Sequence, residues 1–116
     1  MQLKNYACGE WVAGTGKQAE LLDASTGELV ATTSSNGLDF AHMLHYARTV
    51  GGSPLRKMTF PERGRMLKAL AMYLMERKDK YYTISYRTGA TKADSWVDIE
   101  GGIGNLFANA SLRRVP

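Results

Sequence analysis

Glycines and a lysine near the start of the chain stand in an order typical of phosphate-binding loops. The run Gly14-Thr15-Gly16-Lys17 is similar to the end of such a loop, in which backbone amides and a lysine hold phosphates. However, Gln18 follows the lysine where Ser or Thr would bind magnesium, and no glycine stands five residues before Gly16. We therefore predict a tight turn here rather than a nucleotide site.

A second glycine-containing run has the beginning of a dinucleotide-binding fingerprint. Gly102 and Gly104 have the spacing of its first two glycines, but Phe107 stands in place of the third. The fingerprint also needs a strand directly before it, and the preceding residues do not have the pattern of a strand. The sequence therefore predicts no cofactor-binding residue in this chain.

Two histidines and one cysteine complete the candidates for chemistry. His42 and His45 stand about one helical turn apart, but a metal site needs three or four ligands, and the nearby Asp39 is explained by the helix dipole. Cys8 cannot form an internal disulfide, and the N-terminal sequence offers it no base or anion-stabilising group. We predict surface histidines, a structural or exposed thiol, no metal site and no catalytic residue.

The net charge of +4 is unevenly distributed along the chain. Residues 54–92 carry ten basic and three acidic side chains, whereas the segments on either side are slightly acidic. A segment of this charge could bind nucleic-acid phosphates. Its basic residues are spread around a helical pattern, and no ladder of aromatic residues accompanies them. We favour a solvated helix surface and expect no nucleic-acid partner.

Length and composition limit the class of protein. With 116 residues, 44% hydrophobic and 22% charged, the chain is expected to form one soluble domain with a small core, which excludes a large multidomain enzyme for this chain. No apolar stretch approaches the roughly 18 residues that cross a bilayer, and the first residues lack the apolar region of a secretory signal. We expect a cytoplasmic protein without membrane contact.

The predicted secondary structure changes from strands to helices near residue 38. From Trp11 to Ser34, short apolar segments separated by turn residues predict a β-meander or a pair of hairpins. Apolar residues at helical spacing then predict a helix over 38–50, which Gly51-Gly52 would end in the left-handed conformation.

Capping patterns predict the later helices. Thr59 and Glu62 form a capping box, and the apolar period after them continues to Gly89, with a possible restart at Asp79. Ser95 and its partner Asp98 predict a third helix that runs to about Ala110. Its glycines at 101, 102 and 104 each cost about 1 kcal/mol relative to alanine, which suggests close packing or a close approach.

Four segments together resemble the N-terminal part of the aldehyde dehydrogenase superfamily, over nearly the whole chain. They are NYACGEWVAGTGK, LLDASTGELVATTSS, FPERGRMLKALAMYLMERKDKYY and RTGATKADSWVDIEGGIGNLFANAS. The run TGATKADSWVDIEGGIG is the most specific. It resembles the dehydrogenase half of bifunctional phenylacetate-degradation enzymes, which join it to a hydratase that opens the oxepin-CoA ring, and a semialdehyde dehydrogenase of benzoyl-CoA breakdown begins similarly.

The resemblance implies a strand-and-helix segment of the cofactor domain of a longer, NADP- or NAD-dependent enzyme. The nucleophilic Cys, the general-base Glu, the oxyanion-hole Asn and the Rossmann strands of the superfamily would all lie beyond residue 116. In the complete enzymes of the superfamily, a thiolate attacks the aldehyde, hydride passes to the nicotinamide, and activated water releases the acid. We therefore expect the chain alone to be inactive and to contain no cofactor.

The resemblance also implies a position for the last helix, at the mouth of the substrate tunnel. This places Trp96 and Ile99 near the tunnel rim. The glycines at 101, 102 and 104 would leave room for an acyl-CoA tail, or serve helix packing alone. Many members of the superfamily bind a monovalent cation through an acid just before the loop glycine. This sequence has Arg87-Thr88-Gly89 there, which argues against a cation site. The Lys-Pro that follows the glycine in the family is replaced by Ala90-Thr91.

Taken together, these patterns predict an α+β fragment of an aldehyde dehydrogenase fold, with β hairpins over 1–37 and three or four helices over 38–116. The expected function is that of a segment of a dehydrogenase for a CoA-linked semialdehyde of aromatic-acid catabolism. A non-enzymatic interaction or oligomerisation domain and a basic nucleic-acid-binding module are the alternatives. We expect self-association and packing against the remainder of the dehydrogenase polypeptide.

Overall fold

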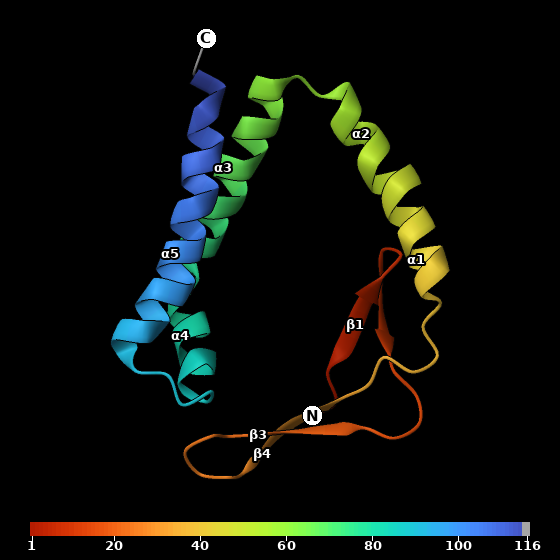
Figure 1. Ribbon diagram of the computed structural model, residues 1–116, viewed down its shortest axis with the longest axis vertical. Helices are drawn as coiled ribbons and strands as arrows, with labels where there is room; N and C mark the ends of the chain where they lie inside the picture. The colour runs from red at the N-terminus through yellow and green to blue at the C-terminus, as the bar shows by residue number, and fades with distance from the viewer. Residues whose placement is uncertain (115–116) are drawn as a thin grey trace. The chain divides into compact units, whose positions relative to one another are not determined.

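The computed structural model describes residues 1–114, in which antiparallel strands are followed by helices (Figure 1). This confirms the predicted α+β class. The chain divides into two compact units, Met1–Arg56 and the residues from Lys57 onward. The change from strand to helix expected near residue 38 therefore lies inside the first unit, whose helices follow its hairpins in the chain.

The first hairpin pairs β1 (Lys4–Ala7) with β2 (Glu10–Ala13) in antiparallel register. Cys8 and Gly9 form its two-residue turn with φ of 52° and 82°, as expected for a turn that requires positive φ at both positions. Across the strands, the rings of Tyr6 and Trp11 lie 5.1 Å apart. The strand pattern was described only from Trp11 onward, so β1 was not named as a strand, although it lies within the hairpin region predicted over 1–37.

The second hairpin pairs β3 (Ala19–Leu22) with β4 (Leu29–Thr33). Its turn is stabilised by Asp23, whose Oδ1 accepts hydrogen bonds from the amides of Ser25 and Thr26. Within residues 1–114, the strands form two separate two-stranded sheets, so the alternative of two hairpins is confirmed and the meander is wrong.

The first helical segment runs past its predicted end. α1 (Phe40–Tyr46) begins at Asp39, whose carboxylate accepts from the His42 amide at 3.0 Å. A π-helical turn, Ala47–Gly51, leads directly into α2 (Gly52–Lys57). The predicted left-handed stop is wrong, because Gly52 has φ of −72° and its amide bonds to Ala47 five residues back. The wider turn lies just before Pro54, which lacks an amide donor.

The long helix α3 (Phe60–Glu76) begins as predicted. The Thr59 hydroxyl accepts from the Glu62 amide at 3.3 Å, and the Glu62 carboxylate accepts from the Thr59 amide at 2.7 Å. This reciprocal pair confirms the capping box. The helix ends at Glu76, and α4 (Lys78–Tyr86) follows after Arg77. Asp79 lies in the first turn of α4 and is not its N-cap, so that part of the prediction is wrong.

The last helix, α5 (Lys92–Ser111), begins one turn earlier than predicted. Thr91 is its N-cap, and the Thr91 hydroxyl accepts from the Asp94 amide at 3.1 Å. Ser95 is buried instead, where its hydroxyl lies 2.8 Å from that of Ser85 in α4. Because a buried hydroxyl needs a partner, Ser95 joins two helices rather than capping one. A short 3-10 turn, Leu112–Arg114, ends the described chain.

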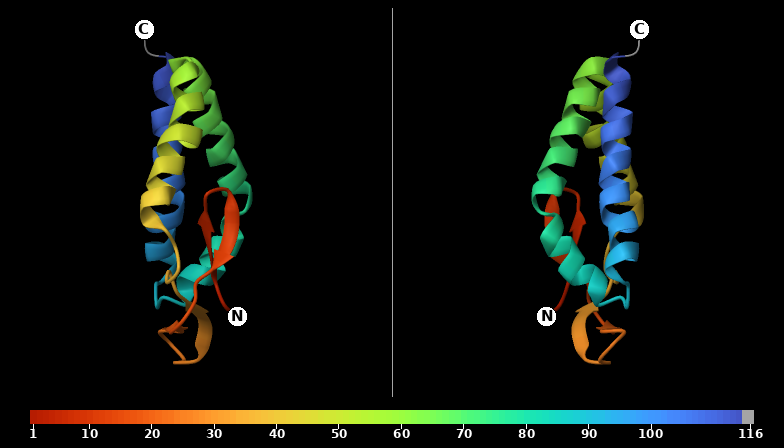
Figure 2. Two further views of the ribbon diagram at one scale, coloured as in Figure 1. Left: turned by 90° about the vertical axis from the view of Figure 1, so that its right-hand side faces the viewer. Right: turned by 90° about the vertical axis from the view of Figure 1, so that its left-hand side faces the viewer.

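Small residues bring α3 and α5 together in the second unit, where the two helices lie side by side (Figure 2). Ala71 is fully buried, and Ala110 is 1% exposed. A Cβ atom added at Gly64 would lie 2.8 Å from the Arg113 Cβ and 3.1 Å from the Ala110 carbonyl oxygen. Gly64 is therefore required by close packing of the two helices.

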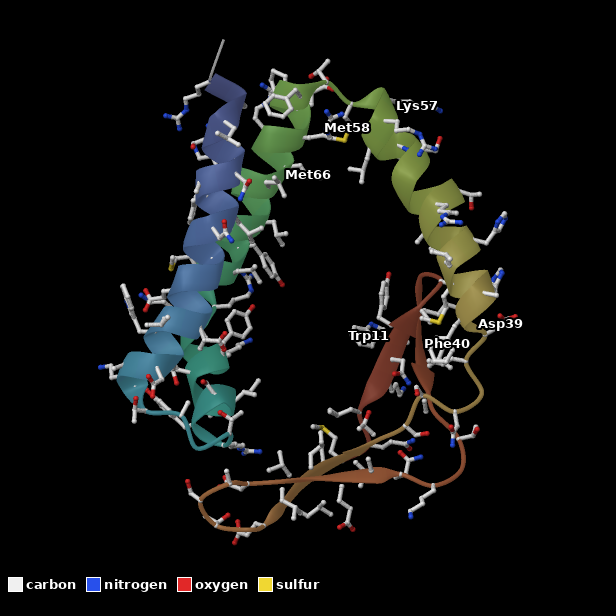
Figure 3. The ribbon with its side chains drawn as sticks, viewed as in Figure 1. Trp11, Asp39, Phe40, Lys57, Met58 and Met66 are labelled. Atoms are coloured by element: carbon white, nitrogen blue, oxygen red, sulfur yellow. The ribbon has the colours of Figure 1, made fainter. Side chains whose placement is uncertain are left out.

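Most large apolar side chains of both units lie on the surface. In Figure 3, Trp11 projects from the first hairpin, Phe40 from the first turn of α1 and Met66 from α3, and all three are exposed. Among the described residues, the buried apolar side chains are Ala7, Ala31, Ala71, Ile103 and Ala110. The core thus consists mainly of small residues, and the larger apolar side chains remain available for contacts with other protein.

Candidate functional site

A groove lies between α4 and α5 of the second unit, with a volume of about 720 Å³. This is within the range of small-molecule sites, about 300–1,000 Å³. Its walls combine aromatic rings with charged side chains from both helices. They are formed by Lys78, Asp79, Tyr82, Tyr86, Lys92, Ala93, Trp96 and Glu100.

A polar clamp at Glu100 joins the two walls of the groove. The Lys78 ammonium lies 3.0 Å from one Glu100 carboxylate oxygen, and the Tyr82 hydroxyl donates a hydrogen bond to the other. The Glu100 side chain is 18% exposed, so its charge depends on these partners more than on water. The clamp connects one residue of α5 to two positions on α4, four residues apart on one helix face.

The clamp shifts the pKa values of its members in opposite directions. Desolvation of the phenol, followed by its hydrogen bond to Glu100, raises the pKa of Tyr82 from 10.0 to about 12. The hydrogen bonds from Tyr82 and then Lys78 lower the pKa of Glu100 below its ordinary value of 4.5. At neutral pH, Tyr82 is therefore a proton donor and Glu100 an anion, which suits binding and positioning rather than proton transfer.

We expect Glu100→Gln to destabilise the protein at neutral pH and much less in acid. Because folding lowers the pKa of Glu100, its contribution is present above pH 4.5 and is lost as the pH falls through the folded-state pKa. Urea unfolding followed by circular dichroism should give a wild-type-to-variant gap that narrows between about pH 7 and about pH 2.5. Glu76→Gln is the control, since Glu76 is 70% exposed and its pair with Arg77 is weak. An equal gap at both pH values would contradict the role of Glu100.

The two predicted rim residues lie in different hollows. Trp96 lines the groove and is 56% exposed. Ile99 lines a smaller hollow of about 280 Å³ beside Leu74, Tyr81 and Ile103. The structure therefore does not bring Trp96 and Ile99 into one cavity, and their place at a tunnel rim stays a prediction.

The glycines of α5 do not serve close packing among the described residues. A Cβ added at Gly101, Gly102 or Gly104 would find no atom within 4 Å. Residues 1–114 therefore contain no atom against which these glycines pack closely, and both interpretations of them stay predictions for the complete enzyme. They also do not form a dinucleotide cradle, because they lie inside α5, where helical hydrogen bonds use the backbone amides.

The remaining candidates take the simpler roles predicted for them. Gly16 has φ of 69° in a bend, and the Gln18 side chain donates to the carbonyl oxygens of Gly14 and Gly16. His42 and His45 are exposed, and Cys8 is half-buried in its turn. Among residues 1–114, no three His, Cys, Asp or Glu side chains gather where they could hold a metal ion. None of the described helices is long and apolar enough to span a membrane.

Comparison with known proteins identifies the class to which this fold belongs. The sequence pattern of the aldehyde dehydrogenase family matches residues 11–114, so the chain belongs to that family. A 3,4-dehydroadipyl-CoA semialdehyde dehydrogenase from Aromatoleum evansii is 42% identical over 104 residues, which are 89% of this chain. The match spans 20% of that relative's length. The resemblance stated from the sequence is thereby confirmed.

Sequence reasoning missed the polar clamp. Lys78, Tyr82 and Tyr86 recur at four-residue intervals, a signal that these side chains share one face of a helix. Glu100, the partner of Lys78 and Tyr82, lies 18 residues after Tyr82, and periodicity within one helix does not show which residue of another helix it meets.

Proposed function

We propose that this chain is the N-terminal segment of an NADP- or NAD-dependent aldehyde dehydrogenase that oxidises a CoA-linked semialdehyde in aromatic-acid catabolism, such as phenylacetate degradation. The observation that carries the proposal is the 42% identity to a CoA-semialdehyde dehydrogenase, which includes the region of the groove. The segment contributes a surface to the complete enzyme, and the nucleophile and the cofactor site belong to the remainder of the polypeptide.

The exposed apolar side chains support the remainder of the polypeptide as the partner. Leu70 and Ile84 of the helical unit are 45% and 63% exposed, and Phe60 is 55% exposed. Exposed apolar side chains that gather into a large patch are usually covered by other protein. We place the complete enzyme in the cytoplasm, with neither membrane nor nucleic acid as a partner.

Complementation tests this proposal. The Aromatoleum evansii relative, truncated to remove its matched segment, should be inactive alone and should regain oxidation of its CoA-linked semialdehyde when mixed with this chain. The isolated chain should produce no reduced nicotinamide by absorbance with either cofactor. Turnover by the isolated chain, or a soluble truncated enzyme that binds the chain without regaining activity, would contradict the proposal.

In the absence of such a partner, the chain should associate with itself. The apolar contacts would come from Leu67, Leu70, Leu74 and Ile84, or from the hairpin strands around Leu21 and Leu29 through edge pairing. Sedimentation velocity should show the average mass rising with concentration in the micromolar range. The double variant Leu70→Gln, Ile84→Gln should shift the sedimentation distribution toward the monomer. If the unsubstituted chain is a monomer at all concentrations, these apolar faces do not mediate self-association.

A further inference from the structure

The groove between α4 and α5 offers exposed aromatic rings and a lysine in addition to the clamp at Glu100; of these rings, that of Tyr86 also lies 6.1 Å from the ring of Tyr82. Trp96 and Tyr86 present exposed ring surface from opposite helices, 56% and 42% exposed. Lys92 also lines the groove, and within residues 1–114 its ammonium has no hydrogen bond or ion pair. Aromatic surface near a free cation is the combination that binds a flat ring carrying an anionic group.

The charges of the groove favour an anion at the Lys92 end. Lys78 and Tyr82 already satisfy the Glu100 carboxylate, so Glu100 repels an anion less than a free acid would. Lys92 stands eight residues before Glu100 on α5, about 12 Å along the helix axis. Asp79 is the one other acid of the lining, and the structure gives it no side-chain partner among the described residues.

We propose that this groove binds the adenine nucleotide end of a CoA thioester, with the adenine ring against Trp96 and Tyr86 and a phosphate on Lys92. The proposal rests on the proposed function in one respect, that the substrate carries CoA. Stacking of a base on an aromatic side chain contributes about 1–3 kcal/mol, and a lysine pairs with phosphate as a point charge. The groove volume suits a nucleotide.

The same adenine chemistry could come from a dinucleotide cofactor, but the position of the groove favours CoA. A dinucleotide must bring its nicotinamide to the reacting carbon, and no cysteine thiol stands among the residues that line the groove. The nucleotide of CoA is separated from the reacting acyl group by a long flexible pantetheine chain. It can therefore bind at a distance from the chemistry.

Fluorescence of Trp96 tests the proposal in the full 116-residue chain. Trp11→Phe leaves Trp96 as the sole tryptophan, and adenosine 3′,5′-bisphosphate should quench it with saturation. Lys92→Ala and Tyr86→Ala should each weaken binding by about tenfold, while Asp79→Asn should strengthen it several-fold. Lys80→Ala is the matched control, because it removes the same charge from α4 outside the groove and should leave the affinity unchanged.

Three further ligands test whether the groove recognises the adenine nucleotide of CoA or that of a dinucleotide cofactor. CoA should bind as tightly as the bisphosphate, whereas pantetheine should not quench and NADP should bind at least tenfold more weakly. Equal binding of NADP, no quenching in a chain with native circular dichroism, or equal loss in Lys80→Ala and Lys92→Ala would each overturn the proposal. If the nucleotides do not bind but the chain complements the truncated relative, the proposal for the groove is rejected and the proposed function is kept. If the bisphosphate and CoA bind but the chain does not complement the truncated relative, the proposed function is rejected and the proposal for the groove is kept.

Discussion

Replacing Gly64 with leucine should lower the free energy of unfolding of the helical unit by about 3 kcal/mol, at the upper end of the usual cost of overpacking. The reason is that even one added carbon would lie 2.8 Å from the Arg113 Cβ and 3.1 Å from a backbone oxygen of α5. Neither atom is the end of a flexible side chain, so α3 and α5 must separate. Urea unfolding followed by circular dichroism measures the loss.

Gly101→Ala is the matched control for this prediction. Gly101 is also a helical glycine, but a Cβ there meets no atom within 4 Å. Alanine should therefore stabilise the isolated chain by up to about 1 kcal/mol through helix propensity alone. Similar effects of the two substitutions would show that the α3–α5 contact does not depend on Gly64.

The start of a helix could be predicted from the sequence where a single short capping pattern is present. The capping box of α3 needs only Thr59 and Glu62, three residues apart, and the structure contains both of its hydrogen bonds. The same reasoning misplaced the start of α5, because Thr91–Asp94 and Ser95–Asp98 have identical spacing. Burial of Ser95 against Ser85 decides between them, and burial depends on a neighbouring helix.

Gly51 and Gly52 led the prediction to an incorrect helix end. Gly51-Gly52 has the composition of a helix stop, but glycine also adopts ordinary helical angles, and Gly52 does so at φ of −72°. The β1 strand was not named because four residues give little alternation and its turn at Cys8-Gly9 is not one of the common turn dipeptides.

The candidate site could be predicted only in part, for a physical reason. Trp96 was named as a rim residue because the resemblance places its helix near the substrate entrance; it lines the groove, and its place at a tunnel rim stays a prediction. The clamp of Lys78 and Tyr82 on Glu100 joins two helices, and the spacing of residues along one helix does not fix its register against another. Contacts of this kind become visible only when both helices are placed.

We propose that this chain supplies the N-terminal segment of a CoA-semialdehyde dehydrogenase, and replacing that segment in a relative tests the proposal most directly. In the Aromatoleum evansii enzyme, the 104 matched residues should be replaced by their counterparts from this chain, and kcat/KM for its CoA-linked semialdehyde measured. The same hybrid with Gly64→Leu is the control and should lose activity together with stability. We expect the hybrid to keep kcat/KM within about tenfold of the parent, which corresponds to about 1.4 kcal/mol in transition-state stabilisation. A folded hybrid that binds the nicotinamide cofactor but does not oxidise the semialdehyde would contradict the proposal.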